Sequence, residues 1–208
     1  NKNFVWLNNK LIKLDIPDDS NINDLLNNQL IVHLKSDWKV NNTLYKQGTL
    51  VSMNFTQLIE GKKEIQSIYV PDQFSNIEGA SVTKNKLLVN VLKNVKSELY
   101  VFGFKNGKWE KTKVPAPDFG TLNIGSIDEF SDQYFFYFQN FLTPSTLYIG
   151  DATTNKISVV KSLPAFFDSK KYTVNQYKAK SKDGTMIPYF VVAPKKLVKN
   201  SKNTTLLY

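Results

Sequence analysis

The chain alternates short apolar segments with polar turn sequences over most of its length. The apolar segments are rich in β-branched and aromatic residues, and most of them alternate or form a short apolar run, which is typical of β-strands. They are LIVHLK (30–35), TLVSMNF (49–55), EIQSIYV (64–70), KLLVNVLK (86–93), ELYVFGF (98–104), QYFFYFQ (133–139) and TLYIGD (146–151). The pattern predicts an all-β fold. Only SNINDLLNNQ (20–29) is helix-like, and its asparagines disfavour a helix.

Residue pairs that suit tight turns separate the apolar segments. Asparagine and glycine adopt the positive φ angles of two-residue hairpin turns at low cost. Such pairs are Asn8-Asn9, Asn41-Asn42, Glu60-Gly61, Asn106-Gly107 and Asp183-Gly184. We therefore expect many neighbouring strands to be joined by hairpins.

A weak internal repeat gives the strands an order. The segments SELYVFGFKNGKWEKTKVP (97–115) and STLYIGDATTNKISVVKSLP (145–164) share a strand beginning Ser-x-Leu-Tyr, a polar turn, a second strand with lysines and a closing proline. The segments 4–17 and 56–71 have the same shape. The closing prolines Pro17, Pro71, Pro115 and Pro164 follow one another at intervals of 54, 44 and 49 residues.

These intervals match the blades of a β-propeller, four-stranded sheets that recur at roughly 40–50 residues. Residues 72–115 and 116–164 each hold four predicted strands. We therefore predict a partial β-propeller over residues 1–164, with about three four-stranded blades preceded by the outer half of another. A proline lacks an amide donor, so it fits the end of each blade's outermost strand. The alternative is a β-sandwich whose prolines are evenly spaced by coincidence.

The pattern changes after Pro164. Residues 170–195 predict two longer strands around the Asp183-Gly184 turn, and a lysine-rich loop and a new apolar segment follow. We place a domain boundary near residues 165–170, so that residues 165–208 form a connector and the first strands of another domain. Because the chain begins with Asn rather than Met, we expect it to be an internal segment.

The composition narrows the classes of function. The net charge of +9 is typical of proteins that bind nucleic acids, but all 27 basic residues are lysines and they are scattered along the chain. Arginine, which binds guanine edges and phosphates through two hydrogen bonds, is absent. No apolar run approaches the ~20 residues of a membrane span. We therefore expect neither nucleic-acid nor membrane partners. We expect a soluble protein, although the sequence does not distinguish cytoplasm from periplasm.

Few residues qualify as candidates for chemistry. Cysteine is absent, which excludes disulfides, thiolate nucleophiles and zinc–thiolate sites. His33 is the single histidine and lies in a predicted strand, so we expect a structural or surface role for it. Asp168 belongs to the predicted connector, and Asp183 is explained by turn geometry. We predict no metal site.

Aromatic residues form a second set of candidates. The run from Tyr134 to Phe138 could stack on bases or sugars. A central blade strand between neighbouring blades needs the same residues, and we favour that interpretation. Trp38 and Trp109 are possible pocket residues, but blade packing explains them better.

Residues 141–195 resemble a known family. The segments FLTPSTLYIGD (141–151) and KSLPAFFDSKKYTVNQYKAKSKDGTMIPYFVVAPK (161–195), followed by TTLLY (204–208), are similar to the prolyl oligopeptidase family of serine peptidases. Upstream, SDWKVNNTLYKQGTLVS (36–52) resembles a blade segment of one branch of it. The resemblance implies that residues 141–195 join the last propeller blade to an α/β-hydrolase domain.

The resemblance assigns no catalytic residue to this chain. The family's nucleophilic serine lies in a downstream Gly-x-Ser-x-Gly turn, followed by its Asp and His partners. That motif does not occur here, and IGSID (124–128) lacks its glycine pattern. Of the family's Tyr-Gly-Tyr-Gly-Gly-Phe segment, whose second tyrosine helps to hold the oxyanion, only the first tyrosine is present, as Tyr208. We expect no catalytic, cofactor-binding or metal-binding residue, and no activity of these 208 residues alone.

Two functions remain open. The resemblance implies a parent serine oligopeptidase that cleaves short peptides, preferably after proline and without a cofactor, whose propeller restricts access of substrates. Its partners would be the peptide substrate, the hydrolase domain and further N-terminal blades. The alternative is a non-enzymatic propeller that binds protein or peptide partners. Exposed blade edges and faces also predict self-association of the chain.

Overall fold

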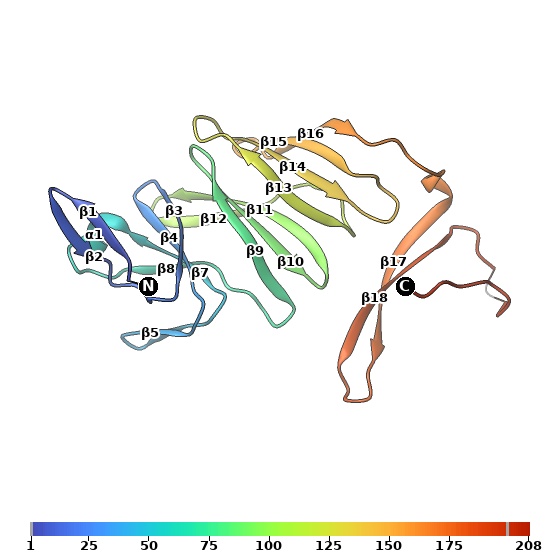
Figure 1. The fold of residues 1–208 in the computed structure, drawn as a ribbon, viewed down its shortest axis with the longest axis horizontal. Helices are drawn as coiled ribbons and strands as arrows, with labels where there is room; N and C mark the ends of the chain where they lie inside the picture. The colour runs from blue at the N-terminus through green and yellow to red at the C-terminus, as the bar shows by residue number, and fades with distance from the viewer. Residues whose placement is uncertain (1, 199) are drawn as a thin grey trace.

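The computed structural model describes residues 2–198 and 200–208. Three four-stranded antiparallel sheets follow one another along the chain (Figure 1). The first contains β3 (Asn21–Leu26), β4 (Gln29–His33), β7 (Leu50–Asn54) and β8 (Ile65–Tyr69). The second contains β9 (Ser75–Val82), β10 (Leu87–Lys93), β11 (Lys96–Lys105) and β12 (Lys108–Lys113). The third contains β13 (Thr121–Ile127), β14 (Gln133–Gln139), β15 (Thr146–Asp151) and β16 (Lys156–Ser162).

Smaller elements flank and interrupt these sheets. An N-terminal hairpin pairs β1 (Phe4–Leu7) with β2 (Lys10–Lys13), and a C-terminal hairpin pairs β17 (Tyr172–Lys180) with β18 (Met186–Pro194). A third hairpin, β5 (Trp38–Val40) and β6 (Thr43–Tyr45), is inserted in the first sheet, with α1 (Phe55–Ile59) after β7. The 3-10 helix η1 (Ser169–Lys171) precedes β17. The predicted all-β class and the predicted order of three four-stranded sheets after a two-stranded half are confirmed.

The proline pattern marks sheet boundaries as predicted. Each of Pro17, Pro71, Pro115 and Pro164 follows within four residues of the end of β2, β8, β12 and β16, respectively. Strands β8, β12 and β16 are edge strands of their sheets. Each sheet therefore has its first strand at one edge and its last strand at the other. The first strand lies near a neighbouring sheet, as β3 does near β9, and the last strand ends before a proline.

The hydrophobic core is divided between successive sheets. In β10, Leu87, Val89 and Val91 pack against the first sheet, and Leu88 packs against the third. In β4, Ile31 packs toward the second sheet, whereas Leu30 and Val32 pack toward the N-terminal hairpin. Alternate side chains of a strand point to opposite faces, so these nearly continuous apolar runs fill two cores at once. Burial of each such side chain contributes roughly 1.5–3 kcal/mol.

The interpretation of residues 20–29 as helix-like is wrong. This segment forms β3 and the turn Asn27-Asn28, in which both residues have positive φ, 48° and 60°. The turn pairs Leu26 with Gln29, so it closes a two-residue hairpin. The asparagines that weaken a helix are the residues that favour this turn.

The predicted strand–turn–strand shape of residues 56–71 is also wrong in its first half. A helical turn, α1, begins after Asn54, whose side chain accepts a hydrogen bond of 3.1 Å from the Gln57 amide. Asparagine is a favoured helix N-cap, and Leu58 buries the apolar side of the turn. Only the second half forms a strand, β8.

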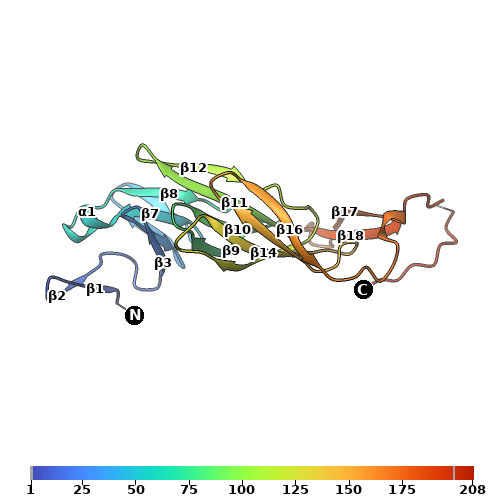
Figure 2. The same ribbon diagram turned by 90° about the horizontal axis from the view of Figure 1, so that it is seen from above.

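The sheets lie side by side along the long axis of the molecule (Figures 1 and 2). The N-terminal hairpin lies at one end of this row and the hairpin β17–β18 at the other. The longest helix in the described part of the chain, α1, has five residues, so no helix there could cross a membrane.

Candidate functional site

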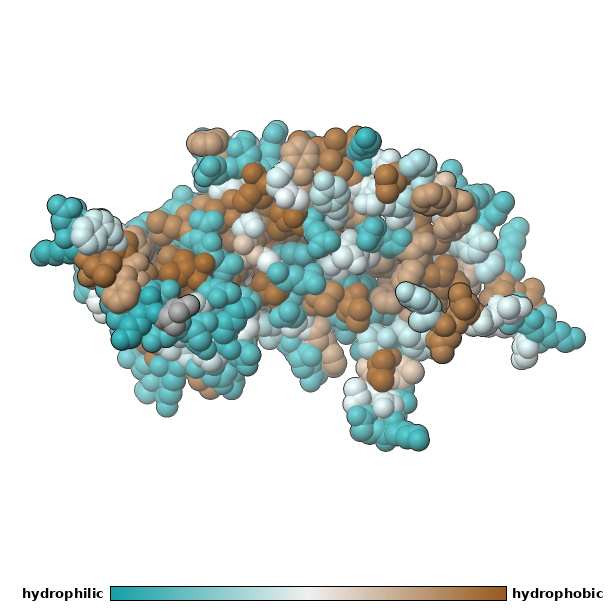
Figure 3. Space-filling model, in the orientation of Figure 1, coloured by the Kyte–Doolittle hydropathy of each residue, from teal (hydrophilic) through white to brown (hydrophobic). Residues whose placement is uncertain are grey.

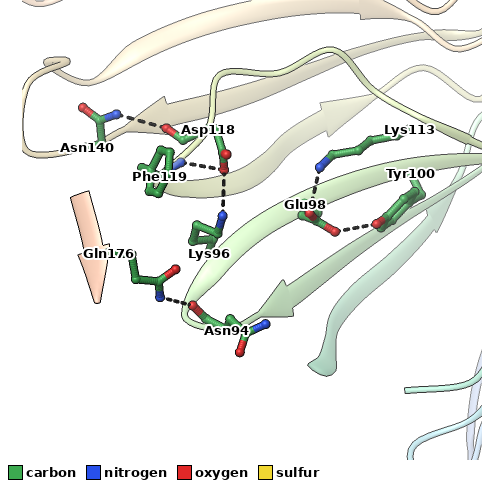
Figure 4. Close-up of polar contacts among 9 residues, drawn as sticks. All are labelled: Asn94, Lys96, Glu98, Tyr100, Lys113, Asp118, Phe119, Asn140 and Gln176. Carbon is green, nitrogen blue, oxygen red and sulfur yellow. Dashed lines mark hydrogen bonds and ion pairs between the residues drawn. The ribbon is translucent and has the colours of Figure 1, made fainter. Parts of the chain in front are cut away.

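The C-terminal hairpin contacts the ends of the second and third sheets. Gln176 in β17 donates a hydrogen bond of 2.7 Å from Nε2 to the main-chain oxygen of Asn94 (Figure 4). The Lys178 ammonium lies 5.0 Å from the centre of the Phe74 ring, and Phe190 in β18 lies 5.7 Å from Phe141, ring centre to ring centre. We call the sheet surface that these contacts define the hairpin seat.

The turn between β10 and β11 forms the centre of the hairpin seat. Asn94 and Val95 both have positive φ, 49° and 65°, and the Asn94 amide donates to the Phe74 carbonyl at 2.9 Å. A β-branched residue rarely adopts this conformation, which costs on the order of 1–3 kcal/mol. The Asn94 carbonyl that faces Gln176 therefore belongs to a turn that the surrounding structure holds in place.

Polar contacts join the second and third sheets beside this turn (Figure 4). Lys96 Nζ lies 3.5 Å from Asp118 Oδ1 and 4.4 Å from the centre of the Phe119 ring. The Asp118 carbonyl accepts 3.2 Å from Asn140 Nδ2. Next to them, Gly120 approaches the Gln139 carbonyl and the Phe138 ring so closely that no Cβ would fit. These contacts fix the loop that forms one wall of the hairpin seat.

A cavity opens on each side of the Asn94-Val95 turn. One, of about 340 Å³, lies between the second sheet and the hairpin, where Phe74, Leu92, Met186 and Pro188 contribute apolar walls. The other, of about 440 Å³, lies between the third sheet and the hairpin. Its lining combines the apolar residues Val95, Phe119, Phe141 and Phe190 with the polar residues Thr121, Gln139, Asn140, Thr143 and Ser145.

These linings can bind a ligand but supply no catalytic pair. Their polar groups are amides and hydroxyls, and Lys178 is the one ionisable group among the residues that line these two cavities. A general base needs a titratable partner within hydrogen-bond reach of a nucleophile. The described residues also contain no group of three or more His, Cys, Asp or Glu side chains placed to hold a metal ion.

A second ionisable cluster lies on β11 and β12. Glu98 accepts from Lys113 Nζ at 2.7 Å and from the Tyr100 hydroxyl (Figure 4). Burial alone would raise the pKa of Glu98, but the hydrogen bonds from Lys113 and Tyr100 outweigh it, so the pKa lies below its usual value. Burial and the Glu98 bond raise the pKa of Tyr100. Both groups thus keep their ordinary charge near neutral pH, and we interpret the cluster as structural.

Asp132 links the second and third sheets at a distance from the hairpin seat. Its carboxylate accepts from the Thr83 hydroxyl at 2.8 Å and from the Asn85 amide at 2.8 Å. It also accepts from Asn85 Nδ2 at 3.0 Å and from the Thr153 hydroxyl at 2.6 Å. Partial burial would raise the pKa of Asp132, but the bonds from Thr153, Asn85 and Thr83 lower it to about 2.

The ionisable residues considered from the sequence lie on separate elements. His33 ends β4, with Nδ1 3.5 Å from Lys35 Nζ, and burial followed by the Lys35 charge lowers its pKa. Asp168 precedes η1 and pairs with Lys171 at 3.3 Å. Asp183 lies in the β17–β18 turn, where Gly184 has a φ of 89°, which confirms the turn interpretation.

The aromatic candidates are core residues, as favoured from the sequence. Tyr134, Phe136 and Phe138 are fully buried between the second and third sheets, whereas Tyr137 on the opposite face is exposed. Trp109 packs against the core between the first and second sheets, and its Nε1 donates to the Ser52 hydroxyl at 2.7 Å. Trp38 packs with Tyr45 over the core of the first sheet.

A family model matches most of the chain. Residues 7–163 match the model described as prolyl oligopeptidase, N-terminal β-propeller domain. The chain belongs to this family. The three sheets are therefore propeller blades, and the predicted partial propeller is confirmed. No closed ring is formed by the sheets of the described residues.

Relatives of the prolyl oligopeptidase propeller family extend the comparison. The chain is 34% identical to an uncharacterized peptidase of Sinorhizobium fredii over 95% of this chain and 28% of that protein. It is 30% identical to a prolyl endopeptidase of Elizabethkingia meningoseptica over 50% of this chain and 15% of that protein. A solved post-proline cleaving enzyme from Rickettsia typhi superposes with a TM-score of 0.76 and 26% identity, over 95% of this chain and 30% of that one. The chain thus spans less than a third of these proteins.

The sequence did not identify the residues of the hairpin seat. Nothing in KYTVNQYKAK distinguishes Gln176 from Asn175, because both are polar residues in an alternating strand. The Asn94-Val95 turn was missed because valine is not a turn residue. Phe141, Gln176, Lys178 and Phe190 lie in the segments that resemble the family, but the resemblance does not show which side chains make the contact.

Proposed function

We propose that this chain forms part of the propeller of a serine oligopeptidase that cleaves short peptides after proline. Residues 1–164 would form its C-terminal blades, and residues 165–208 would connect them to an α/β-hydrolase domain and begin it. The observation that carries the proposal is that the likeness to the Rickettsia typhi enzyme covers 95% of the chain. Because residues 1–164 are less than 95% of the chain, this likeness must continue past the last blade into the C-terminal part of the chain.

A gating role for the blades is part of this proposal and follows from the family resemblance. The hairpin lies against the sheet ends through one side-chain hydrogen bond, one aromatic pair and one lysine–aromatic contact, with a cavity on each side of the central turn. In the proposed enzyme, blades at this position would cover the active site and exclude large folded substrates. The serine, histidine and oxyanion donors of acyl transfer would come from residues outside this chain.

The test is an activity assay of the full-length parent on a short chromogenic peptide that contains proline. We expect hydrolysis that a serine-directed phosphonate abolishes. Absence of hydrolysis, or hydrolysis that the phosphonate does not affect, would refute the proposal. The 208-residue chain should show no turnover, and activity of the pure chain would disprove our assignment of no catalytic residue to it.

A non-catalytic propeller that binds protein or peptide partners is the second candidate. The observation in its favour is the lining of the two cavities, which combines amides, hydroxyls and aromatic rings with aliphatic side chains. The gene sequence after Tyr208 decides between the two. A Gly-x-Ser-x-Gly motif downstream favours the peptidase, and a stop codon or a missing serine favours the binding module.

A further inference from the structure

The charges of the chain differ between the two edges of each sheet. The first strands β3, β9 and β13 contain two acidic residues and no lysine, whereas the last strands β8, β12 and β16 contain five lysines and one acidic residue. Figure 2 shows β3 and β9 on one side of the row of sheets and β8 and β12 on the other. We call the side formed by β3, β9 and β13 the first-strand edge.

The first-strand edge is where successive sheets approach one another. Strand β3 contacts β9, and β13 contacts β10 and β11 of the second sheet. The blades of a propeller are arranged around a central channel, and the strands along which the blades converge line that channel. In a complete propeller, the first-strand edge therefore faces the channel.

The acidic character of this edge extends to the turns at both ends of its strands. Residues 18–28, 72–85 and 118–132, which comprise the three first strands and these turns, hold nine of the 18 acidic residues and one of the 27 lysines. Their net charge is −8, although the whole chain carries +9. Figure 3, in which this edge faces the viewer, shows hydrophilic residues interspersed with apolar ones along it. The nine acidic residues are Asp18, Asp19, Asp24, Asp72, Glu78, Asp118, Asp128, Glu129 and Asp132.

Few of these carboxylates are neutralised by lysines. Among the residues that the structure describes, Asp72 and Asp118 alone of the nine form ion pairs, with Lys93 at 3.9 Å and Lys96 at 3.5 Å, respectively. Both lysines flank the Asn94-Val95 turn, so these pairs lie at the end of the edge that is nearest the C-terminal hairpin. The other seven carboxylates carry their charge without an ion pair at neutral pH, because aspartate and glutamate ionise near pH 4.

Each first strand also carries a β-bulge at a corresponding position. The extra residues in the three bulges are Asn23, Glu78 and Gly125. A bulge re-aims a side chain and is common at the rims of barrels and next to active sites. Glu78 is exposed, and its Oε2 lies 3.3 Å from Asn90 Nδ2, which also donates to the Leu122 carbonyl of β13 at 3.0 Å. The Glu78 carboxylate therefore lies where the second and third sheets meet along the first-strand edge.

We propose that the first-strand edge selects peptide substrates by charge, because its carboxylates attract cationic peptides to the channel and repel acidic ones. This inference rests on the proposed function and names the class of peptide that the enzyme prefers. A cleft lined by one sign of charge raises the local concentration and the association rate of substrates of the opposite sign. Asp24 and Glu78, which lie within the first strands, are the specificity-determining residues and take no part in the chemistry.

The arrangement of the carboxylates disfavours other ligands. A nucleic acid or an anionic membrane carries the same sign of charge as this edge and is repelled by it. A metal ion needs several ligands that converge on one point, and the described residues hold no group of three or more acidic or histidine side chains placed in that way. The carboxylates are instead spread along strands such as β9, whose eight residues span about 26 Å. An extended cationic peptide matches such a spread of charge.

The test is the hydrolysis of matched peptides by the full-length protein. Two chromogenic peptides share the residues around the scissile proline and carry either three lysines or three glutamates at the distant N-terminal end. We expect kcat/KM for the lysine peptide to exceed that for the glutamate peptide about tenfold at low salt, because attraction raises the association rate. The ratio should fall toward one between about 0.05 and about 0.5 M NaCl, because salt screens exposed charges.

Matched variants locate the source of the preference. Asp24→Asn/Glu78→Gln removes two charges from the first strands and keeps an acceptor oxygen at each position, and the ratio of the two kcat/KM values should fall several-fold. Glu64→Gln/Glu110→Gln removes the same charge from the opposite edge, before β8 and within β12, and should leave the ratio unchanged. No preference in the unaltered protein, or equal ratios in the two variants, would overturn the proposal.

A second measurement reports binding without catalysis. Fluorescence anisotropy of the same two peptides, labelled with fluorescein, gives their Kd values for the full-length protein. We expect the lysine peptide to bind more tightly at low salt, and Asp24→Asn/Glu78→Gln to raise its Kd several-fold. Equal Kd values for the two peptides would contradict selection by charge.

The outcomes separate this inference from the proposed function. A protein that hydrolyses neither peptide but binds the lysine peptide in a way that depends on Asp24 and Glu78 would refute only the proposed function. Hydrolysis of both peptides with equal kcat/KM would refute only this inference. Salt-sensitive dimers that Asp24→Asn/Glu78→Gln abolishes would assign the first-strand edge to the lysines of a second copy, and our proposal would be wrong.

Discussion

At the scale of single residues, polar side chains between the sheets carry much of the specificity of the stack. Asp132 accepts four hydrogen bonds from residues of two sheets. Asn90, buried in β10, donates 3.0 Å from Nδ2 to the Leu122 carbonyl of the third sheet. A hydrogen bond to a charged acceptor contributes up to roughly 3 kcal/mol to the free energy of unfolding. Loss of such an acceptor also leaves several donors without a partner.

Replacement of Asp132 should weaken the contact between the second and third sheets. We expect Asp132→Ala to lower the free energy of unfolding by about 2–4 kcal/mol, measured by urea titration. Glu129→Gln, which removes a nearby exposed carboxylate, should change it by less than about 0.5 kcal/mol. Equal effects of the two variants would show that the contacts of Asp132 are not the cause.

The same carboxylate predicts a pH dependence. The folded pKa of Asp132 is about 2, whereas an unfolded aspartate titrates near 3.9. Because the folded pKa is depressed, the stabilisation is complete above about pH 4 and is lost as the pH falls toward 2. The difference in unfolding free energy between the wild type and Asp132→Ala should therefore shrink over this window. A difference that stays constant between pH 5 and pH 2 would contradict the assignment.

Close packing at Gly150 gives a second prediction at this scale. The buried Tyr134 ring lies where a Cβ on Gly150 would be, whereas no atom lies within 4 Å of a Cβ on Gly79. Gly150→Ala should destabilise the chain by about 1–3 kcal/mol through overpacking. Gly79→Ala should be nearly neutral in the same thermal or urea unfolding experiment.

At the scale of elements, the sequence predicted strands well and turns incompletely. Apolar runs such as KLLVNVLK define strands because both faces of a blade are covered, and the repeat of prolines located the three sheets. The helix-like interpretation of residues 20–29 failed because Asn27-Asn28 was not recognised as a hairpin turn. The hairpin seat could not be predicted, since the contact between Gln176 and Asn94 joins elements 82 positions apart.

The hydrogen bond from Gln176 should anchor the C-terminal hairpin. We expect Gln176→Ala to weaken the contact by about 0.5–1.5 kcal/mol and to raise hydrogen exchange in the Asn94-Val95 turn and in β17. Asn175→Ala, a change on the opposite face of the same strand, should leave exchange at the turn unaltered. Unchanged exchange in Gln176→Ala would refute the anchoring role.

At the scale of the whole molecule, both ends of the row of sheets carry exposed apolar side chains. The N-terminal hairpin exposes Trp6 and Leu11, and the outer side of the third sheet exposes Tyr137. The same faces of the sheets in the middle of the row are covered by a neighbouring sheet, whereas at the two ends no neighbour covers them. Uncovered patches of this kind favour association.

We therefore expect the 208-residue chain to self-associate at high concentration through these two ends. Trp6→Ser/Leu11→Ser should reduce the average mass measured by light scattering, because it removes one of the surfaces. A monodisperse monomer of the unaltered chain at high concentration would contradict this expectation.

The division of the core into three clusters, each shared by successive elements, has a consequence for how the chain unfolds. Apart from the contacts of the C-terminal hairpin with the second sheet, each sheet packs against its nearest neighbours, so the chain should behave as a linear stack whose stability is a sum of unit and interface terms. Unfolding should then begin at the two terminal elements of the row and proceed toward its centre. The second sheet, with a four-stranded sheet on either side, should be the last to unfold, and its strands should remain paired as a template on which the neighbouring sheets refold.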